Sequence, residues 1–125
     1  SAFAGCKSLP SIQIPEGVKT IGERTFEGCE KLKAIKLPES IVEIKNFAFR
    51  RCSALKTVEI PQKVAKIGQS SFSDCAALTT MKIYNNKMIF DLWAFENCPK
   101  LTLRAAPDSS AERYAKSNNI PFKKL

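Results

Sequence analysis

The stretch LKAIKLPESIVEIKNFAFRRC, residues 32–52, decides the fold because its pattern recurs along the chain every 23 residues. Three columns of this repeat keep a single residue type in all five copies. Phenylalanine stands at positions 3, 26, 49, 72 and 95, cysteine at 6, 29, 52, 75 and 98, and leucine at 9, 32, 55, 78 and 101. Repetition at a fixed spacing of about 20 to 50 residues is typical of solenoids and related repeat architectures.

One repeat unit is too small to enclose a core of its own, so neighbouring units must stack. Stacking brings each apolar column onto its copy in the next coil, at about the 4.8 Å spacing of β-strands. We therefore predict a mainly-β or α/β solenoid of about five right-handed coils. The structural ladder in its interior comprises Phe26, Cys29, Leu32, Phe49, Cys52, Leu55, Phe72, Cys75 and Leu78.

Within one coil, the spacing of apolar residues predicts two extended segments and a turn. The pattern Leu32-x-x-Ile35-x-Leu37 ends in the alternation that is typical of a strand with one buried face. Pro38 cannot donate to a strand ladder and so marks the end of this strand. Residues 41–44 predict a second extended segment, and the spacing of three across residues 48–55 predicts a helical or 3₁₀ turn.

The chain divides into repeats over residues 1–107, the first of them partial, and a cap over residues 108–125. Ser109-x-x-Glu112 fits a capping box at the start of a helix. An apolar stripe would turn this helix onto the last coil: Ala111, Tyr114 and Ala115. Residues 120–122 would return as a last edge strand. In the irregular coil at residues 84–93, the period places Lys87 in a column that elsewhere holds valine or isoleucine.

Composition bounds the function. The chain has 125 residues and a net charge of +8, from 20 Lys and Arg against 12 Asp and Glu, which favours acidic partners. No run approaches the roughly 18 apolar residues of a membrane helix, so we expect no direct membrane insertion. Because residue 1 falls in the middle of a repeat, we expect the sequence to be part of a longer chain, with any signal upstream.

The sequence lacks the residues and motifs that catalysis usually requires. There is no histidine, no phosphate-binding glycine loop and no nucleophile elbow, so we predict no enzyme activity, no catalytic residue, no cofactor and no small-molecule substrate. Zinc sites need thiolates that converge on one point, whereas cysteines 23 residues apart lie in a line along the axis. Strand spacing is also wider than the roughly 3.8 Å between the Cβ atoms of a disulfide. We therefore predict no metal site and a ladder of reduced, buried thiols.

The exposed face of the first strand of each coil is the candidate binding surface. Outward side chains that alternate with the buried column there are small or charged, which suits a protein or glycan better than a small molecule. Glu59 is expected to make cross-strand ion pairs with Lys36 and Lys82. The candidate binding residues are Gln13, Lys33, Lys36, Lys56, Thr57, Glu59, Thr80 and Lys82, with Trp93 as an aromatic anchor.

The pattern Leu-x-x-Ile-x-Ile-Pro-x-x-Val-x-x-Ile-Gly-x-x-x-Phe-x-x-Cys, over residues 1 to about 106, resembles the BspA-like leucine-rich repeat of bacterial surface proteins. The ending Asp108–Phe122 also resembles the end common in that family. The resemblance implies an extracellular or cell-surface location. It also implies adhesion to a protein or glycan on another cell or in the matrix.

Two alternatives to adhesion stay open. The coils could form a structural spacer with no ligand of its own. The other alternative, binding to nucleic acid or another polyanion, rests on the net charge alone. The outward strand columns contain no aromatic residue that could stack on bases. The oligomeric state cannot be read from the sequence.

Overall fold

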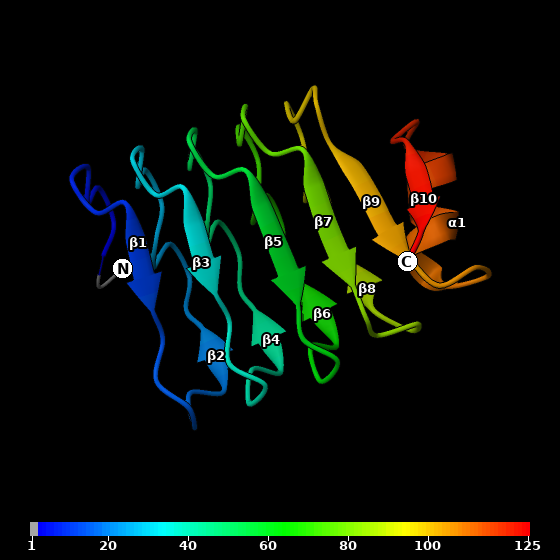
Figure 1. Ribbon diagram of the computed structural model, residues 1–125, viewed down its shortest axis with the longest axis horizontal. Coiled ribbons are helices and arrows are strands. Elements are labelled where there is room, and N and C mark those ends of the chain that lie inside the picture. The colour runs from blue at the N-terminus through cyan, green and yellow to red at the C-terminus, as the bar shows by residue number, and fades with distance from the viewer. Residues whose placement is uncertain (1–2) are drawn as a thin grey trace.

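The computed structural model of the protein describes residues 3–125, so the start of the predicted first repeat, residues 1 and 2, lies outside the described residues. The chain forms a parallel β-solenoid of repeated coils that ends in a helix and a strand, as predicted (Figure 1). Each complete coil contributes one strand to each of two parallel sheets. No helix in the described part of the chain is long and apolar enough to cross a membrane.

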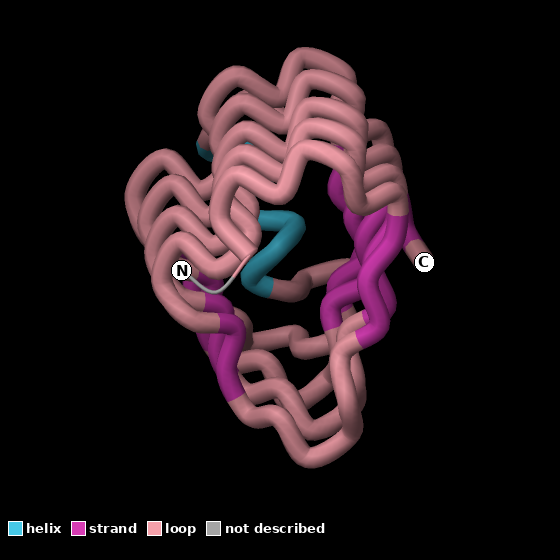
Figure 2. The backbone as a smooth tube through the Cα atoms, turned by 90° about the vertical axis from the view of Figure 1, so that its left-hand side faces the viewer, coloured by secondary structure: helices cyan, strands magenta, loops and turns pink. Residues whose placement is uncertain are grey.

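The two sheets lie on different sides of the coil (Figure 2). The long sheet has the order β1 (Ser11–Gln13), β3 (Ala34–Lys36), β5 (Thr57–Ile60), β7 (Thr80–Ile83), β9 (Thr102–Ala105) and β10 (Phe122–Lys124). The short sheet has the order β2 (Thr20–Ile21), β4 (Glu43–Ile44), β6 (Lys66–Ile67) and β8 (Ile89–Phe90). Loops join the sheets and close each coil.

Stacked phenylalanines fill the centre of the coils. Consecutive rings along the axis from Phe3 to Phe95 lie 5.0 to 5.9 Å apart and are nearly parallel. This stacking is close to the strand spacing, so ring contact and strand pairing reinforce each other. Phe49 and Phe72, in the middle of the stack, are fully buried. All nine residues of the predicted structural ladder are buried.

The cysteine column makes a second ladder, through hydrogen bonds between coils. Each thiol from Cys29 to Cys98 donates to the carbonyl of the phenylalanine 26 residues earlier, at sulfur–oxygen distances of 3.0 to 3.2 Å. Cysteine therefore fits this column as a small buried side chain with one weak donor. Burial raises the pKa of the Cys52 thiol to about 12, and burial also raises the pKa of Cys29.

The predicted turn at the end of each coil is present with 3₁₀-type hydrogen bonds, but it does not continue into a helix. The segment contains short turns with i to i+3 hydrogen bonds, such as Arg50 N–H to Phe47 O at 3.2 Å, but no helix. Left-handed residues interrupt it at two places in each coil from the second to the last, for example Phe47 at φ 60° and Arg51 at φ 63°. The spacing of three came from turns that follow one another, and a helix cannot pass through left-handed residues.

The cap follows the last coil. Helix α1 (Ser110–Ser117) begins after Ser109, whose hydroxyl accepts from the Glu112 N–H, while the Glu112 carboxylate accepts from the Asp108 N–H. Its apolar stripe contacts the last coil, where the Tyr114 ring stacks on Phe90 at 4.3 Å between centroids. The edge strand after α1 is Phe122–Lys124, two residues later than residues 120–122 predicted from the sequence.

In the irregular coil, the prediction that Lys87 occupies the apolar column is wrong. The turn after β5 closes with Val64 N–H donating to Pro61 O, whereas the equivalent turn after β7 closes with Met88 N–H donating to Asn85 O. The turn has thus moved by one residue in the coil where Tyr84 takes the place of the proline of the preceding coils. Met88 is therefore buried in the column, and Lys87 is exposed.

Two serines in the core predict opposite effects of the same substitution. The buried Ser71 hydroxyl has no hydrogen-bond partner among the described residues, whereas the Ser73 hydroxyl donates to Trp93 O at 2.8 Å. Because Ala48 and Ala94 fill the Ser71 column in the adjoining coils, Ser71→Ala should raise the free energy of unfolding by about 1 kcal/mol. Ser73→Ala should lower it by about 1 kcal/mol. Denaturant unfolding of both variants measures the difference, and equal effects would contradict this account.

The raised thiol pKa predicts a loss of stability at high pH. In the unfolded chain the thiol ionises near pH 9, whereas Cys52 in the folded chain resists ionisation up to about 12. The stability conferred by the neutral thiol is present below pH 9 and is lost between pH 9 and 12, by about 1.4 kcal/mol per pH unit. Urea unfolding at several pH values across this range measures the free energy of unfolding. This free energy should fall less steeply with pH in Cys52→Ala than in the unsubstituted chain. Parallel slopes would refute it.

Candidate functional site

The outward side of the long sheet is the candidate site, and we call it the sheet face. Strand alternation puts the apolar residues of β5 inside and its Thr57 and Glu59 outside. The strands pair in register, so outward residues form two columns along the solenoid axis. One column holds Ser11, Ala34, Thr57, Thr80 and Thr102, and the other holds Gln13, Lys36, Glu59, Lys82 and Arg104.

The sheet face is uneven because the two columns differ in side-chain length. Short side chains in the first column form a low floor beside the long side chains of the second. Hollows follow this floor along the face. Hollows of about 390 and 270 Å³ lie over β1 and β3 and over β3 and β5, and one of about 260 Å³ lies between Glu59 and Arg104. A partner can therefore approach the strand backbone closely along several coils.

Tyr84 provides the hydrogen-bond partner of Glu59, the carboxylate at the centre of the sheet face. Its hydroxyl donates to Glu59 Oε1 at 2.9 Å. None of the ion pairs formed by the described residues involves Glu59, so the expected cross-strand pairs with Lys36 and Lys82 are wrong. Glu59 instead takes a neutral partner, which leaves both lysine ammonium groups available to another molecule.

Arg104 extends the basic character toward the cap. It stands outward on β9, beside Lys82 of β7 and Lys123 of β10 in register. One terminal nitrogen donates to the Lys124 carbonyl at 3.2 Å, while its Nε is buried without a partner among the described residues. Three basic side chains on adjoining strands are therefore side by side at this end of the sheet face.

The structure brings most of the sequence-predicted binding residues together. Gln13, Lys36, Thr57, Glu59, Thr80 and Lys82 all stand outward on the sheet face. Lys33 and Lys56 lie immediately before β3 and β5 and are exposed. Trp93 does not join them, because it follows β8 of the short sheet; its side chain is 55% exposed.

Sequence reasoning missed three residues of the sheet face. Thr102 and Arg104 were missed because β7 pairs with β9 at an offset of 22 residues, one less than the period. The signal was present in Leu101-x-Leu103, which shortens the Leu-x-x-Ile spacing of the other coils. Tyr84 was not assigned to the sheet face because its column holds proline elsewhere, and its contact with Glu59 joins residues 25 apart.

Groups for other chemistry do not gather on the described residues. Between residues 3 and 125, no group of three or more His, Cys, Asp or Glu side chains is placed to hold a metal ion. Phe47, another aromatic residue near the chain's surface, is already engaged, since the Arg24 and Arg50 guanidinium groups lie 4.3 and 5.5 Å from its ring centre. The arrangement can therefore recognise a surface through shape and positive charge.

The Tyr84–Glu59 contact predicts a perturbed titration. The hydrogen bond to Glu59 raises the pKa of the Tyr84 phenol, while burial raises that of Tyr114, the chain's other tyrosine. Glu59→Gln should lower the pKa of Tyr84 and leave that of Tyr114 unchanged. Ultraviolet titration of the variant, with Tyr84→Phe to assign the signals, measures both groups. An unchanged Tyr84 titration in Glu59→Gln would exclude the contact in solution.

Comparison with known proteins gives consistent results. The family model described as "BspA type Leucine rich repeat region" matches residues 1–117 in six copies. The solved T. pallidum leucine rich repeat protein TpLRR is 36% identical, with a TM-score of 0.79 over 82% of this chain and 49% of that chain. A leucine-rich repeat protein from Bacteroides ovatus is 27% identical, with a TM-score of 0.62 over 99% and 39%.

A leucine-rich repeat protein from Eubacterium ventriosum is 26% identical, with a TM-score of 0.70, and the match covers 82% of this chain and 27% of that chain. The present chain thus spans half or less of each of these solved chains. No curated protein sequence matches it. The family match over nearly the whole chain and the similarity to TpLRR agree with the observed coils. The chain belongs to the BspA-type leucine-rich repeat family.

Proposed function

We propose that this chain is a non-catalytic binding scaffold of a bacterial surface or secreted protein. Its sheet face binds a protein or glycan on another cell or in the matrix. The observation that carries the proposal is the long, hollowed sheet face, on which Lys36 and Lys82 make no ion pair with any described residue.

Rigidity supports this role. From β3 to β9, a buried apolar residue lies between the two outward residues of each strand, as Val58 lies between Thr57 and Glu59. The backbone of such a surface is already ordered, so it loses little conformational freedom when a partner binds. More of the contact energy then contributes to affinity. The surface is also extended, which suits a large ligand better than a small molecule in a closed pocket.

Charge supports an acidic partner. Lys36, Lys82 and Arg104 occupy one column, and the single carboxylate of that column, Glu59, accepts a hydrogen bond from Tyr84. Adjacent strands place these cations at multiples of about 4.8 Å. Anionic groups repeated along a partner, as in sulfated glycans or acidic protein surfaces, can meet several of them at once.

Nucleic acid is a poorer match to the sheet face. Proteins that bind single strands stack bases on aromatic side chains, and duplex readers insert a helix or ribbon into a groove. Tyr84 is the aromatic residue at the edge of the sheet face, and its hydroxyl is held by Glu59. The surface location in this proposal rests on the family membership of the chain.

Reversal of charge on the sheet face tests the proposal. Lys36→Glu with Lys82→Glu should weaken binding to immobilised heparin, or to a decellularised matrix, by roughly tenfold or more without changing thermal stability. Lys19→Glu with Lys63→Glu makes the same change of charge away from the sheet face and serves as the matched control. Surface plasmon resonance on both surfaces measures the difference.

The outcomes separate the alternatives. Equal losses in both double variants would mean that net charge alone drives binding, which contradicts a defined sheet-face site. If the unsubstituted chain binds neither surface, the chain acts as a spacer and the proposal fails. Capture of duplex DNA with a steep salt dependence, lost equally in both variants, would favour a nucleic-acid role instead.

A further inference from the structure

The closing turns are joined by a second set of hydrogen bonds between coils, separate from both sheets. In each of the second, third and fourth coils, three alternate N–H groups donate to carbonyls of the next coil. Those of the fourth coil are Ser70, Phe72 and Asp74, which donate to Leu92, Ala94 and Glu96. The nitrogen–oxygen distances in these three coils are 2.7 to 3.1 Å. All of these donors point along the axis toward the C-terminal end.

The last coil breaks this row. Its equivalent N–H groups belong to Trp93, Phe95 and Asn97, and none of them donates a hydrogen bond to any described residue. The cap extends the long sheet through β10 and covers the core with α1, but it supplies no carbonyls to the closing turn. Phe95 is only 6% exposed, whereas Trp93 and Asn97 are exposed, and none of the three N–H groups has an acceptor among the described residues.

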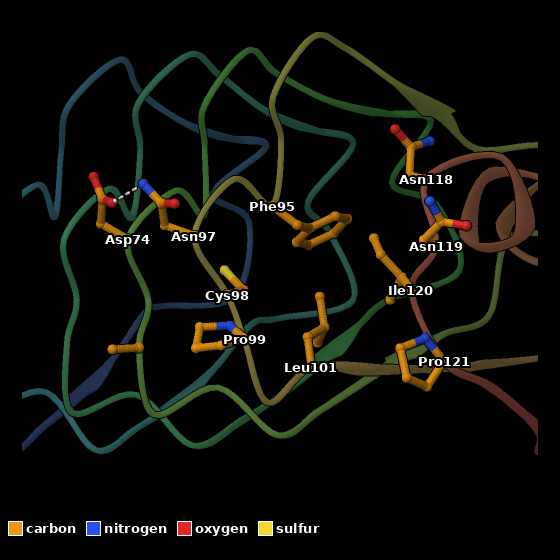
Figure 3. A pocket seen from close by; sticks show the side chains of 11 residues that line it. Asp74, Phe95, Asn97, Cys98, Pro99, Leu101, Asn118, Asn119, Ile120 and Pro121 are labelled. Atoms are coloured by element: carbon orange, nitrogen blue, oxygen red, sulfur yellow. Dashed lines mark hydrogen bonds between the residues drawn. The ribbon is translucent and has the colours of Figure 1, made fainter.

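A cavity lies where the carbonyls of a further turn would stand. We call it the cap cleft; it has a volume of about 590 Å³ and is open to solvent. Phe95, Asn97 and Leu101 of the last coil line one side, and Asn118, Ile120 and Pro121 of the cap line the other (Figure 3). Its size falls within the range of known ligand pockets, about 300 to 1,000 Å³.

The chemistry of the cap cleft resembles that of a peptide site. The Phe95 ring and Ile120 point toward each other (Figure 3), and polar side chains such as Asn118 share the lining with them. Asn119 also lines the cleft, and the Asn97 side-chain amide donates to Asp74 Oδ1 at 2.9 Å (Figure 3). The Asp74 carboxylate beside the cleft disfavours a free anion, whereas neutral carbonyl oxygens satisfy the N–H groups without repulsion.

We propose that the cap cleft binds a short peptide segment in the conformation of the solenoid turn. Its main-chain carbonyls at alternate residues accept from the N–H groups of Phe95 and Asn97, and from Trp93 beyond the cleft. Such a segment fits the row of N–H groups in partial charge and in spacing. In the preceding complete coils, the equivalent N–H groups donate to alternate main-chain carbonyls of the next coil. An apolar side chain of the peptide packs between Phe95 and Ile120. The cap cleft is separate from the sheet face.

The probe is a peptide that already meets such donors within the protein. Residues 69–75, QSSFSDC, offer the carbonyls of Gln69, Ser71 and Ser73 to the third coil. We would use this peptide acetylated, amidated and with serine in place of cysteine, beside a scrambled version. Nuclear magnetic resonance should show downfield shifts and slower hydrogen exchange at the N–H groups of Trp93, Phe95 and Asn97 with the probe alone.

A matched pair of variants locates the binding. Pro99→Trp places a large side chain in the cap cleft, and Ser53→Trp introduces the same side chain in the same column two coils earlier, outside the cleft. This column accepts Glu30 and Ala76 in other coils, so loss of the proline is compatible with the turn. Pro99→Trp should weaken probe affinity roughly tenfold or more, and Ser53→Trp should leave it unchanged.

Defined results would overturn the proposal. If the three N–H groups exchange rapidly and do not shift with the probe in the unsubstituted chain, the cap cleft holds solvent only. Equal shifts with the scrambled peptide, or with acetate, would exclude recognition of the turn conformation. This measurement needs no variant, so it decides the matter even if Pro99→Trp fails to fold. Retained probe binding by Lys36→Glu with Lys82→Glu would separate this site from the sheet face.

Discussion

The structure depends on contact between identical side chains in neighbouring coils. Both faces of a phenylalanine ring are apolar, and in this core they are buried by the rings of the neighbouring coils. Each ring from Phe26 to Phe72 is covered in this way on both sides. The strand ladders and the row of N–H groups in the closing turns use nearly the same spacing as the rings. Each interaction therefore places the coil where the others also need it, and one unit alone could satisfy none of them.

This constraint explains the cysteines as well as the surface. A cysteine column is small enough to pack against the ring stack and donates to the carbonyl of the phenylalanine one coil back, at 3.2 Å for Cys52 and Cys75. Because the interior is occupied by identical ladders, chemical variety is confined to outward positions. The sheet face can vary in charge from coil to coil while the ladder behind it stays constant.

The last coil of a solenoid has no further coil to pack against, so another element must cover it. Here the cap covers the last coil only in part. Helix α1 covers the core, and β10 gives the long sheet a final partner. The closing turn of the last coil receives neither, and two of its three unpaired N–H groups belong to Phe95 and Asn97, which line the cap cleft. The coil next to the cap is also where the repeat slips, at Met88 and again at Leu103. Irregularity and unsatisfied hydrogen-bonding groups thus coincide at the junction of coil and cap.

The period, the inward columns, the two strands of each coil and the capping box at Ser109 could all be predicted from the amino-acid sequence, because each signal is local or is repeated in several copies. The sequence also identified most of the sheet face, since strand alternation follows from the buried column. Tertiary structure decided the features that depend on a particular neighbour. Met88 rather than Lys87 is buried because a turn moved by one residue, and Glu59 bonds Tyr84 rather than a lysine. The cap cleft lies between the last coil and the cap, and because the cap does not follow the repeat, no periodic pattern could predict the cleft.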